Sequence, residues 1–443
     1  MKQRHGLAHI RPWSAASASF PFSIGFLPAA IEFTDKAARG FGFGEAETAG
    51  LVLAVEEIFS FYLKQLAVGE GIDLVLENDV YQLRLTMSFR VADPDLSAFN
   101  LTYRADPNDE ASLAGLGPMI AARSVTRLNL DFGNNDRVRV QLTREKDYDL
   151  AVALEPPARG KSAGPVALHA PGPEDIMHFA ALLASDAGAA VPAFLARPGM
   201  AADMLASGAI GALLASAGGF VLGGVTWRRL NEPTIELFGP YVFYEDAGGE
   251  VFAELLDAAI AQVSRSGARA LLRRQGPLPG FERFFDFLGE LKLKPPKETA
   301  QGGVVWTHYY KQLREETSGV VYAAPRFAGF LRAEYGRLCL PRQVRETSSS
   351  ETERPGASLL SVEFEHRRSL ATLRPLAAGS DMAENLAAHL ALLERDGILN
   401  VIAELDAGRP ASTAFAPALY GSGFSPRLAV PDAGTGDLVI FAR

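Results

Sequence analysis

The chain has 443 residues, 48% of them hydrophobic, which is enough apolar material for several buried cores and excludes a mainly disordered protein. At roughly 150 residues per domain, the length predicts about three domains. The formal net charge of −9 argues against a general nucleic-acid binder and against a polybasic membrane-surface protein. The single cysteine, Cys339, excludes a disulfide within the chain and a cysteine-based zinc site.

The amino-terminal residues carry basic side chains, but Ser14, Ser17 and Ser19 interrupt the apolar run that a signal peptide would need. The apolar stretch 204–225 is punctuated by glycine pairs. It therefore predicts a buried helix followed by a β-hairpin rather than a membrane span. Together with the lone cysteine, these patterns predict a cytoplasmic protein without membrane contact.

Stretches rich in Pro, Gly and Ser mark the boundaries between segments. One lies at 156–165 and another, a solvated loop, at 347–356. A polar connection follows Leu313. We therefore expect three domains, at residues 1–155, 165–313 and 316–443.

The first segment alternates helical and strand patterns. Gly115 and Gly117 stand at the start of an expected helix, where main-chain N–H groups and the helix dipole can hold a phosphate. The expected elements are strands at 73–76, 82–91 and 137–143, and helices at 47–66 and 115–128.

This order resembles the ATP-binding domain of the GHKL superfamily, most of all the bacterial anti-sigma-factor serine kinases. The resemblance starts with a strand at 22–24 and a helix ending near 40. Residues 53–60 are similar to the family's first ATP-site helix, and the resemblance gives Glu57 the role of orienting water or hydroxyl. Asp93 stands where the family's aspartate accepts the adenine amino group. Gly115 and Gly117 resemble the entrance to the lid. The resemblance thus implies ATP or ADP as ligand.

Three residues depart from this pattern. Phe61 replaces the asparagine that holds Mg²⁺, and a phenyl ring offers no oxygen ligand. Gln65 replaces a histidine, and Asp95 places a carboxylate where a phosphate would be repelled. Magnesium-dependent kinase chemistry is therefore disfavoured. Ligand binding without turnover, a structural or dimerising role, and phosphoryl transfer remain open.

The second and third segments share one order of expected elements. This β–turn–α–Gly–β–α–β order predicts mixed α/β (α+β) sheets and indicates an internal duplication, with chance similarity as the alternative. In the second segment the elements are 234–243, 251–264, 268–272 and 281–288. In the third they are 369–376, 382–393, 400–405, 414–420 and 438–441.

The second segment resembles the GNAT acyltransferase fold. Residues 166–168 and 173–176 are similar to its first strand and helix, Gly223–Thr226 to its central hairpin, and 236–243 and 268–272 to its fourth and fifth strands. The resemblance implies that acyl-CoA adds across a gap between those two strands and rests its pyrophosphate at the next helix start. Val242, Gly248 and Gly249 would then bind acyl-CoA. The third segment resembles a second, truncated unit of this kind.

Candidate proton-transfer groups lie on the strands of the second segment. Glu236 is a candidate general base, and His308, Tyr309 and Tyr310 lie together on a late strand. Each also fits a packing role. Glu245, Asp246 and Glu250 place carboxylates near the implied pyrophosphate site. No metal site is expected, because the seven histidines show no metal-binding spacing.

We therefore expect a GHKL-like α/β sandwich followed by two GNAT-like α/β units. The leading hypothesis is a bacterial regulatory or sensor protein that binds ATP, ADP or acetyl-CoA and contacts a protein partner in a sigma-factor pathway. An alternative is an acyl-CoA-dependent N-acyltransferase with a regulatory nucleotide domain, and a third is a structural homodimer. Whether the chain is an enzyme stays open at this point.

Overall fold

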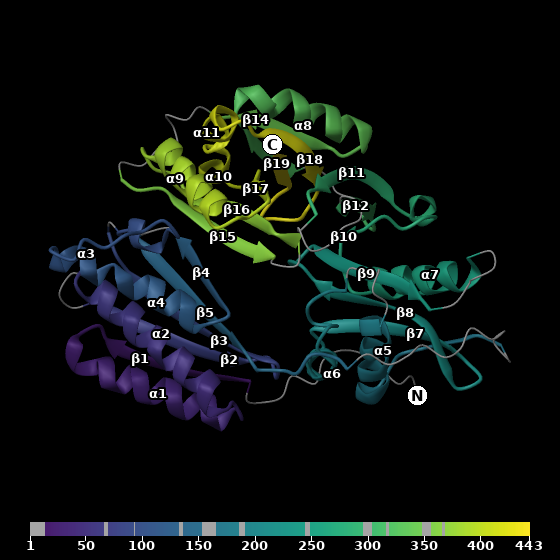
Figure 1. Cartoon of the computed structure of the whole chain (residues 1–443), viewed down its shortest axis with the longest axis horizontal. Coiled ribbons are helices and arrows are strands. Elements are labelled where there is room, and N and C mark those ends of the chain that lie inside the picture. Colours follow the sequence, from purple (N-terminus) through teal and green to yellow (C-terminus); the bar gives the residue numbers. More distant parts are fainter. Residues whose placement is uncertain are drawn as a thin grey trace.

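A computed structural model describes residues 14–65, 70–92, 94–132, 136–152, 165–185, 191–243, 249–295, 304–315, 319–347, 356–365 and 368–443. The predicted mixed α/β class is confirmed, since these residues form three larger sheets flanked by helices and one two-stranded sheet (Figure 1). Most of the two predicted linkers, 153–164 and 348–355, lies outside the described residues. No helix in the described ranges is long and apolar enough to cross a membrane.

The amino-terminal unit is a two-layer sandwich, with α1, α2 and α4 against one face of a sheet ordered β1-β2-β3-β5-β4 (Figure 1). Every second residue of β2 is buried, as period-two alternation requires, and Leu74 and Leu76 share a core with Leu51 and Ile58 of α2. The elements are β1 (Ala15–Pro21), α1 (Leu27–Gly40), α2 (Glu45–Leu63), β2 (Gly71–Asn78), β3 (Gln82–Arg90), α3 (Glu110–Ala114), α4 (Leu116–Ser124), β4 (Arg127–Phe132) and β5 (Arg137–Glu145).

Two expectations for this unit are wrong in detail. The strand predicted at 22–24 lies earlier and ends at Pro21, because the Phe22 ring turns into the core against Phe59 and Phe89. The helix predicted to reach 128 ends at Ser124. There the Thr126 main-chain N–H donates to the Thr143 carbonyl and begins strand pairing.

The middle unit has a seven-stranded sheet in the order β11-β12-β10-β9-β8-β7-β6, in which only β9 and β10 run parallel. Leu213 of β7 shares a core with α7, whereas Leu214 shares one with α5 and α6, so these helices cover opposite faces. The elements are β6 (Ala167–His169), α5 (Pro173–Ser185), α6 (Pro198–Ser207), β7 (Ile210–Ala217), β8 (Phe220–Arg229), β9 (Thr234–Val242), α7 (Glu250–Ser264), β10 (Ala270–Gln275), β11 (Asp286–Leu293) and β12 (Val304–Gln312).

The short helix predicted at 281–288 is wrong beyond its first turn. Residues Phe281–Arg283 form a single 3-10 turn, and β11 then pairs with β12 from Asp286 onward. Ladder pairing overrides the helical pattern here, and Leu288, Leu291 and Leu293 of the resulting strand are buried in the core shared with the carboxyl-terminal unit.

The carboxyl-terminal unit repeats the last five strands of the middle sheet. Its order, β15-β16-β17-β19-β18, corresponds to β8-β9-β10-β12-β11, again with a parallel central pair joined by a helix. The parallel pair β13 and β14 with α8 between them, and the strands β15 and β18, were not expected from the sequence. The elements are β13 (Gly319–Ala323), α8 (Pro325–Arg337), β14 (Arg342–Glu346), β15 (Leu359–Glu365), β16 (Leu370–Ala377), α9 (Met382–Arg395), β17 (Asn400–Asp406), α10 (Pro410–Thr413), α11 (Ala416–Gly421), β18 (Ser425–Val430) and β19 (Leu438–Ala442).

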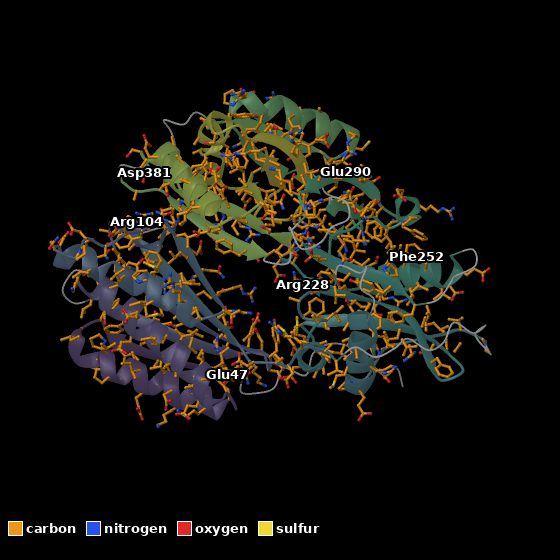
Figure 2. All side chains as sticks on the ribbon, in the orientation of Figure 1. Glu47, Arg104, Arg228, Phe252, Glu290 and Asp381 are labelled. Atoms are coloured by element: carbon orange, nitrogen blue, oxygen red, sulfur yellow. The ribbon has the colours of Figure 1, made fainter. Side chains whose placement is uncertain are left out.

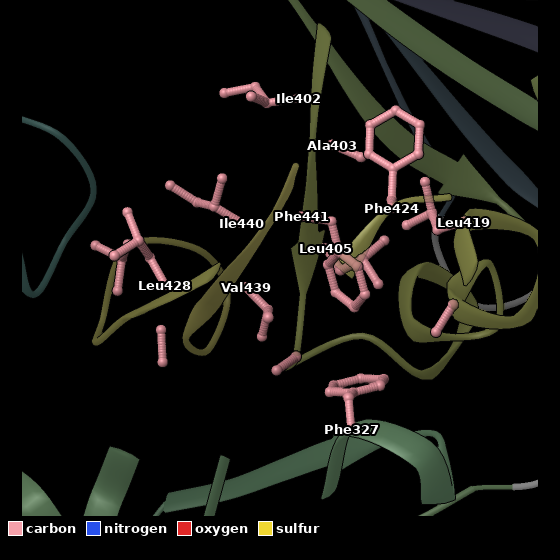
Figure 3. Close-up of a cluster of buried hydrophobic side chains, with 14 of the residues drawn as sticks. Phe327, Ile402, Ala403, Leu405, Leu419, Phe424, Leu428, Val439, Ile440 and Phe441 are labelled. Carbon is pink, nitrogen blue, oxygen red and sulfur yellow. The ribbon is translucent and has the colours of Figure 1, made fainter. Parts of the chain in front are cut away.

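One hydrophobic core joins the middle and carboxyl-terminal units. Leu272 and Trp306 of the middle sheet belong to the same buried cluster as Phe327, Ile402 and Phe441, the last three of which Figure 3 shows in close-up. The two repeats therefore form one body rather than two independent domains.

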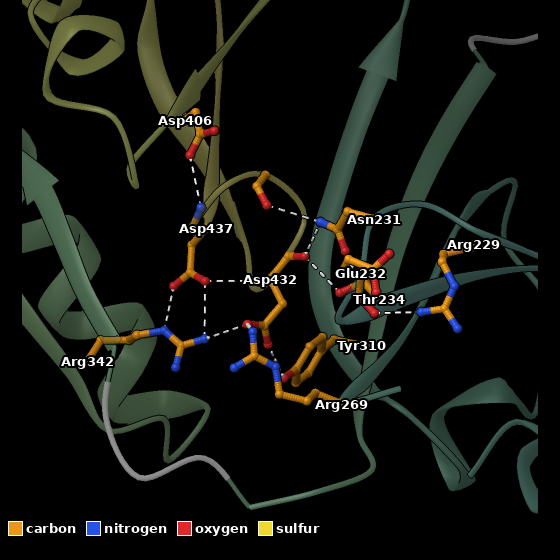
Figure 4. A network of polar contacts seen from close by, with 12 residues as sticks. Arg229, Asn231, Glu232, Thr234, Arg269, Tyr310, Arg342, Asp406, Asp432 and Asp437 are labelled. Atoms are coloured by element: carbon orange, nitrogen blue, oxygen red, sulfur yellow. Dashed lines mark hydrogen bonds and ion pairs between the residues drawn. The ribbon is translucent and has the colours of Figure 1, made fainter. Parts of the chain in front are cut away.

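A buried polar network holds the same two units together (Figure 4). Arg342 of β14 donates to Asp437 at 2.8 Å and lies 3.3 Å from Asp432, and all three side chains are buried. The main-chain carbonyl of Asp432 accepts hydrogen bonds from Asn231 and Thr234 of the middle unit, each at 2.7 Å. Apolar packing and polar contacts therefore both hold the middle unit against the carboxyl-terminal unit.

The amino-terminal unit is attached through a second buried polar cluster. The Asn100 amide donates to the Ser358 carbonyl at 2.8 Å and accepts from the Leu360 N–H at 3.0 Å, as a strand neighbour would. The Asn385 amide of α9 donates to both Asn100 and Ser358. These contacts lie at the amino end of α9.

Candidate functional site

The two parallel strands of the middle sheet separate toward their carboxyl ends. β9 and β10 pair only from Thr234/Ala270 to Glu236/Leu272, although both strands continue. At Gly239–Pro240 the register of β9 against β8 also shifts. Gly239 has a φ of +89°, which favours glycine, and proline cannot donate to a ladder. This break allows β9 to leave β10.

Side chains of β10 cross the base of this gap. The Gln275 amide accepts from the Gly239 N–H at 3.1 Å and donates to the Tyr241 hydroxyl at 2.9 Å. Arg273 donates from Nε to the Gly239 carbonyl at 3.1 Å. Burial lowers the pKa of Arg273 to about 10. Both main-chain groups of Gly239 are therefore already bonded, and any ligand must bind beyond them.

A pocket of about 400 Å³ lies at the mouth of the gap. It brings together Val242 at the end of β9, Gly249 at the start of α7, and the 3-10 turn at Arg283. Phe252 of α7 forms part of its apolar wall (Figure 2). Two of the predicted acyl-CoA residues, Val242 and Gly249, thus meet in one pocket. The third, Gly248, lies outside the described residues.

The charges at this pocket have opposite signs. Gly249 is the N-cap of the 15-residue helix α7, so the positive end of the helix dipole faces the pocket. Arg283 is exposed and has no ion pair among the described residues. Glu250, in the first turn of α7, adds one carboxylate nearby. The other two predicted carboxylates, Glu245 and Asp246, are outside the described ranges.

Glu236 lies on β9 at the far end of the gap, held between two guanidinium groups. Its two carboxylate oxygens lie 2.9 Å from Arg228 and 2.9 Å from Arg274. Burial alone would raise the pKa of Glu236, but the two arginines outweigh it and lower the pKa to about 2. Figure 2 shows Arg228 near the centre of the molecule. A carboxylate so paired favours a structural role, and the assignment as general base stays a prediction.

The other proton-transfer candidates on β12 also have structural partners or surroundings. Burial lowers the pKa of His308 to about 3, and neither ring nitrogen has a hydrogen-bond partner among the described residues. Tyr309 donates to Glu282 at 2.8 Å, next to the pocket turn. Tyr310 contacts Asp432 in the polar network between the units. Tyr309 is thus bonded to the turn that supplies Arg283 to the pocket.

In the amino-terminal unit, the predicted nucleotide residues lie where α4 packs on α2. A Cβ added at Gly117 would lie 3.2 Å from the Glu57 carbonyl oxygen and 3.7 Å from Cβ of Phe61. The Tyr103 ring fills the space beside Gly115 in the same way. Asp93 lies outside the described residues. The structure thus brings Glu57 and Gly117 together by direct packing, and their role toward ATP stays a prediction.

The environments of Glu57 and Phe61 differ. Burial, followed by the charge of Glu56, raises the pKa of Glu57. Phe61 packs edge-on against Tyr62 and Phe99, with ring centroids 5.0 and 5.6 Å apart. Phe61 is therefore a core residue of this unit.

In the carboxyl-terminal unit, main-chain atoms pack closely beside Gly379 before the amino end of α9. A Cβ added at Gly379 would lie 2.4–2.6 Å from main-chain atoms of residues 356–358. The Asp381 carboxylate accepts from the Ser358 N–H at 2.6 Å. The chain itself thus fills the position that corresponds to the pocket beside Gly249.

Sequence reasoning did not identify Arg273, Gln275, Phe252 or Arg283. Gly239–Pro240 inside a strand pattern was the available signal that the strand breaks here. The contacts across the gap follow from the separation of two strands whose residues are more than 30 positions apart, which no local pattern encodes.

No family model matches this chain, and no curated protein does either. Solved structures do match over about a third of it. An N-acetyltransferase from Staphylococcus aureus Mu50 is 17% identical, with a TM-score of 0.28, over 34% of this chain and 99% of its own. A ribosomal-protein-alanine N-acetyltransferase from Brucella melitensis is 16% identical, with a TM-score of 0.29, over 33% and 99%. A GNAT family acetyltransferase from Brucella melitensis, solved with acetyl-CoA, is 20% identical, with a TM-score of 0.24, over 28% and 84%.

Proposed function

We propose that the middle unit binds an acyl-CoA at the mouth of the gap between β9 and β10 and serves an N-acyltransferase reaction. The observation that carries the proposal is the pocket at the carboxyl ends of the two separating strands, closed by the amino end of α7. This is the position that the resemblance to the GNAT fold implies for the thioester and pyrophosphate.

The pocket residues fit such a substrate in two respects. Val242, Phe252 and Phe284 offer apolar surface to a pantetheine arm. The α7 amino end and Arg283 supply positive charge for phosphate groups. In the reaction, an amine nitrogen would attack the thioester carbonyl, the C–S bond would break, and the CoA thiol would leave with the proton.

Charge reversal at Arg283 tests the proposal. Arg283→Glu should weaken acetyl-CoA binding at least tenfold, about 1.4 kcal/mol, because it replaces the pocket's cation with an anion. Isothermal titration calorimetry measures the affinity. The matched control is Arg265→Glu at the C-cap of α7, the end of that helix away from the pocket, which should leave the affinity unchanged. Equal weakening in both variants, or no acetyl-CoA binding by the unaltered protein, would contradict the assignment of the pocket.

A second candidate function is acyl-CoA binding without transfer, in a regulatory protein. It is favoured by the pairing of Glu236 with two arginines and by the side chains of Arg273 and Gln275 that cross the base of the gap. The GHKL-like role of the amino-terminal unit and a sigma-factor partner belong to this reading. Release of free CoA thiol with a panel of amines distinguishes the two candidates, since only the first predicts it.

A further inference from the structure

A second and larger cavity, of about 630 Å³, lies between the middle and carboxyl-terminal units. Residues 290–294 of the edge strand β11 and the segment just after it form one wall. The end of α9 and the start of β17 form another, and Arg427 and Arg443 complete it. Figure 2 labels Glu290 on the β11 side. None of the residues of the acyl-CoA pocket lines this cavity.

The main-chain edge of β11 is already bonded on both sides of the stretch that lines the cavity. At one end Lys294 donates its N–H to the Asn400 side chain at 2.8 Å and accepts from it at 2.9 Å, in place of a neighbouring strand. At the other end Arg337 donates to the carbonyls of Phe287 and Leu288 at 2.8 and 3.3 Å. Only the five residues 289–293 of the strand edge remain between them, roughly 17 Å at 3.3 Å per residue. A long extended peptide therefore does not fit, whereas a small molecule does.

The cavity wall carries more positive than negative charge. It includes Lys292, Lys294, Arg427 and Arg443, against the carboxylates of Glu290 and Glu394. Lys292 pairs with Glu290 at 3.6 Å. The other three cations have no carboxylate partner among the described residues. In a chain with a net charge of −9, three such cations around one cavity indicate an anionic ligand.

The remaining wall is apolar. Leu390 of α9, Ile398 and Val401 are only half-buried and face a cavity with otherwise charged margins. An inorganic ion would leave this surface in contact with water, so the ligand should also carry hydrocarbon. We propose that this cavity binds a small organic anion, a carboxylate or phosphate attached to an apolar body, at the junction of the two repeated units.

Calorimetric titration with four probes tests the proposal: octanoate, octyl phosphate, octan-1-ol and inorganic phosphate. Octanoate or octyl phosphate should bind saturably with one site per chain, at least tenfold more tightly than octanol or phosphate. Whichever of the two binds more tightly identifies the head group. Arg427→Glu and Lys294→Glu should each weaken that binding at least tenfold, and Arg265→Glu should not.

Leu390→Trp, which fills the cavity without changing charge, provides an independent check and should also abolish binding. The proposal is overturned if neither anion binds at concentrations up to about 10 mM, which would mean a binding free energy weaker than about −3 kcal/mol. It is equally overturned if octanol binds as tightly as the anions, or if the folded Arg427→Glu and Leu390→Trp variants bind as the unaltered protein does.

Discussion

Asp437→Ala should destabilise the protein by about 3–5 kcal/mol, the usual cost of removing one partner from a buried ion pair. The Arg342 guanidinium is 2% exposed and the Asp437 carboxylate 1% exposed, with 2.8 Å between them. The variant removes one of the two carboxylates beside this buried guanidinium, the other being Asp432 at 3.3 Å. It also removes the acceptor of the Asp432 main-chain N–H. Urea unfolding followed by circular dichroism measures the loss.

Asp396→Ala is the matched control for this variant. Asp396 pairs with Arg395 at 3.2 Å, but both side chains are more than half exposed, so its removal should cost under about 1 kcal/mol. Because the Arg342 network also holds Asn231 and Thr234, the Asp437 variant should expose the joint between the repeats to protease. A loss below about 1 kcal/mol for Asp437→Ala would show that this network does not hold the two units together.

His308→Leu should remove much of the acid sensitivity of the middle unit. Burial, with the charge of Arg274, lowers the folded-state pKa of His308 to about 3 from an ordinary value of 6.5. Between those values the unfolded chain binds a proton that the folded chain does not. The stability that the neutral imidazole contributes is therefore complete above pH 6.5. As the pH drops from 6.5 toward 3, this group lowers the unfolding free energy by about 1.4 kcal/mol per pH unit.

The readout is the slope of unfolding free energy against pH, because a change in packing alone shifts the curve without tilting it. The unaltered protein should lose about 2 kcal/mol more than the variant between pH 6.5 and 5. Burial lowers the pKa of His389 as well, but His389 is present in both proteins and cancels. Parallel curves for the two proteins would mean that His308 gains a proton in the folded state at ordinary pH.

Much of the fold could be predicted from local patterns. The alternation in β2, the helix α7 after Gly249, and the helix α9 followed by Gly397 were all evident from periodicity and glycine positions. The element order shared by the second and third segments was also evident, and the structure shows the same strand order over five strands of the middle and carboxyl-terminal sheets. Wrong or missing elements, such as 281–288 and β18, depend on pairing with distant strands.

The candidate site was predictable only in part. Val242 and Gly249 were expected from the resemblance to the GNAT fold, and the strand, glycine turn and helix that carry this resemblance are local information. The bonds of Gln275 and Arg273 to Gly239, and the pairing of Glu236 with Arg274, join residues 34–38 positions apart. A general base was expected at Glu236 because the sequence shows a carboxylate on a strand, whereas only the fold shows the two guanidinium groups beside it.

Hydrogen–deuterium exchange with and without acetyl-CoA tests the proposed acyl-CoA site, because it locates the ligand on the chain. With acetyl-CoA bound, main-chain amides should exchange more slowly at the end of β9, in the first turn of α7 and in the turn at Phe281–Arg283. Amides along Lys292–Lys294 and at the α2–α4 contact should be unchanged. Protection confined to those latter segments, or no protection anywhere, would contradict an acyl-CoA site between β9 and α7.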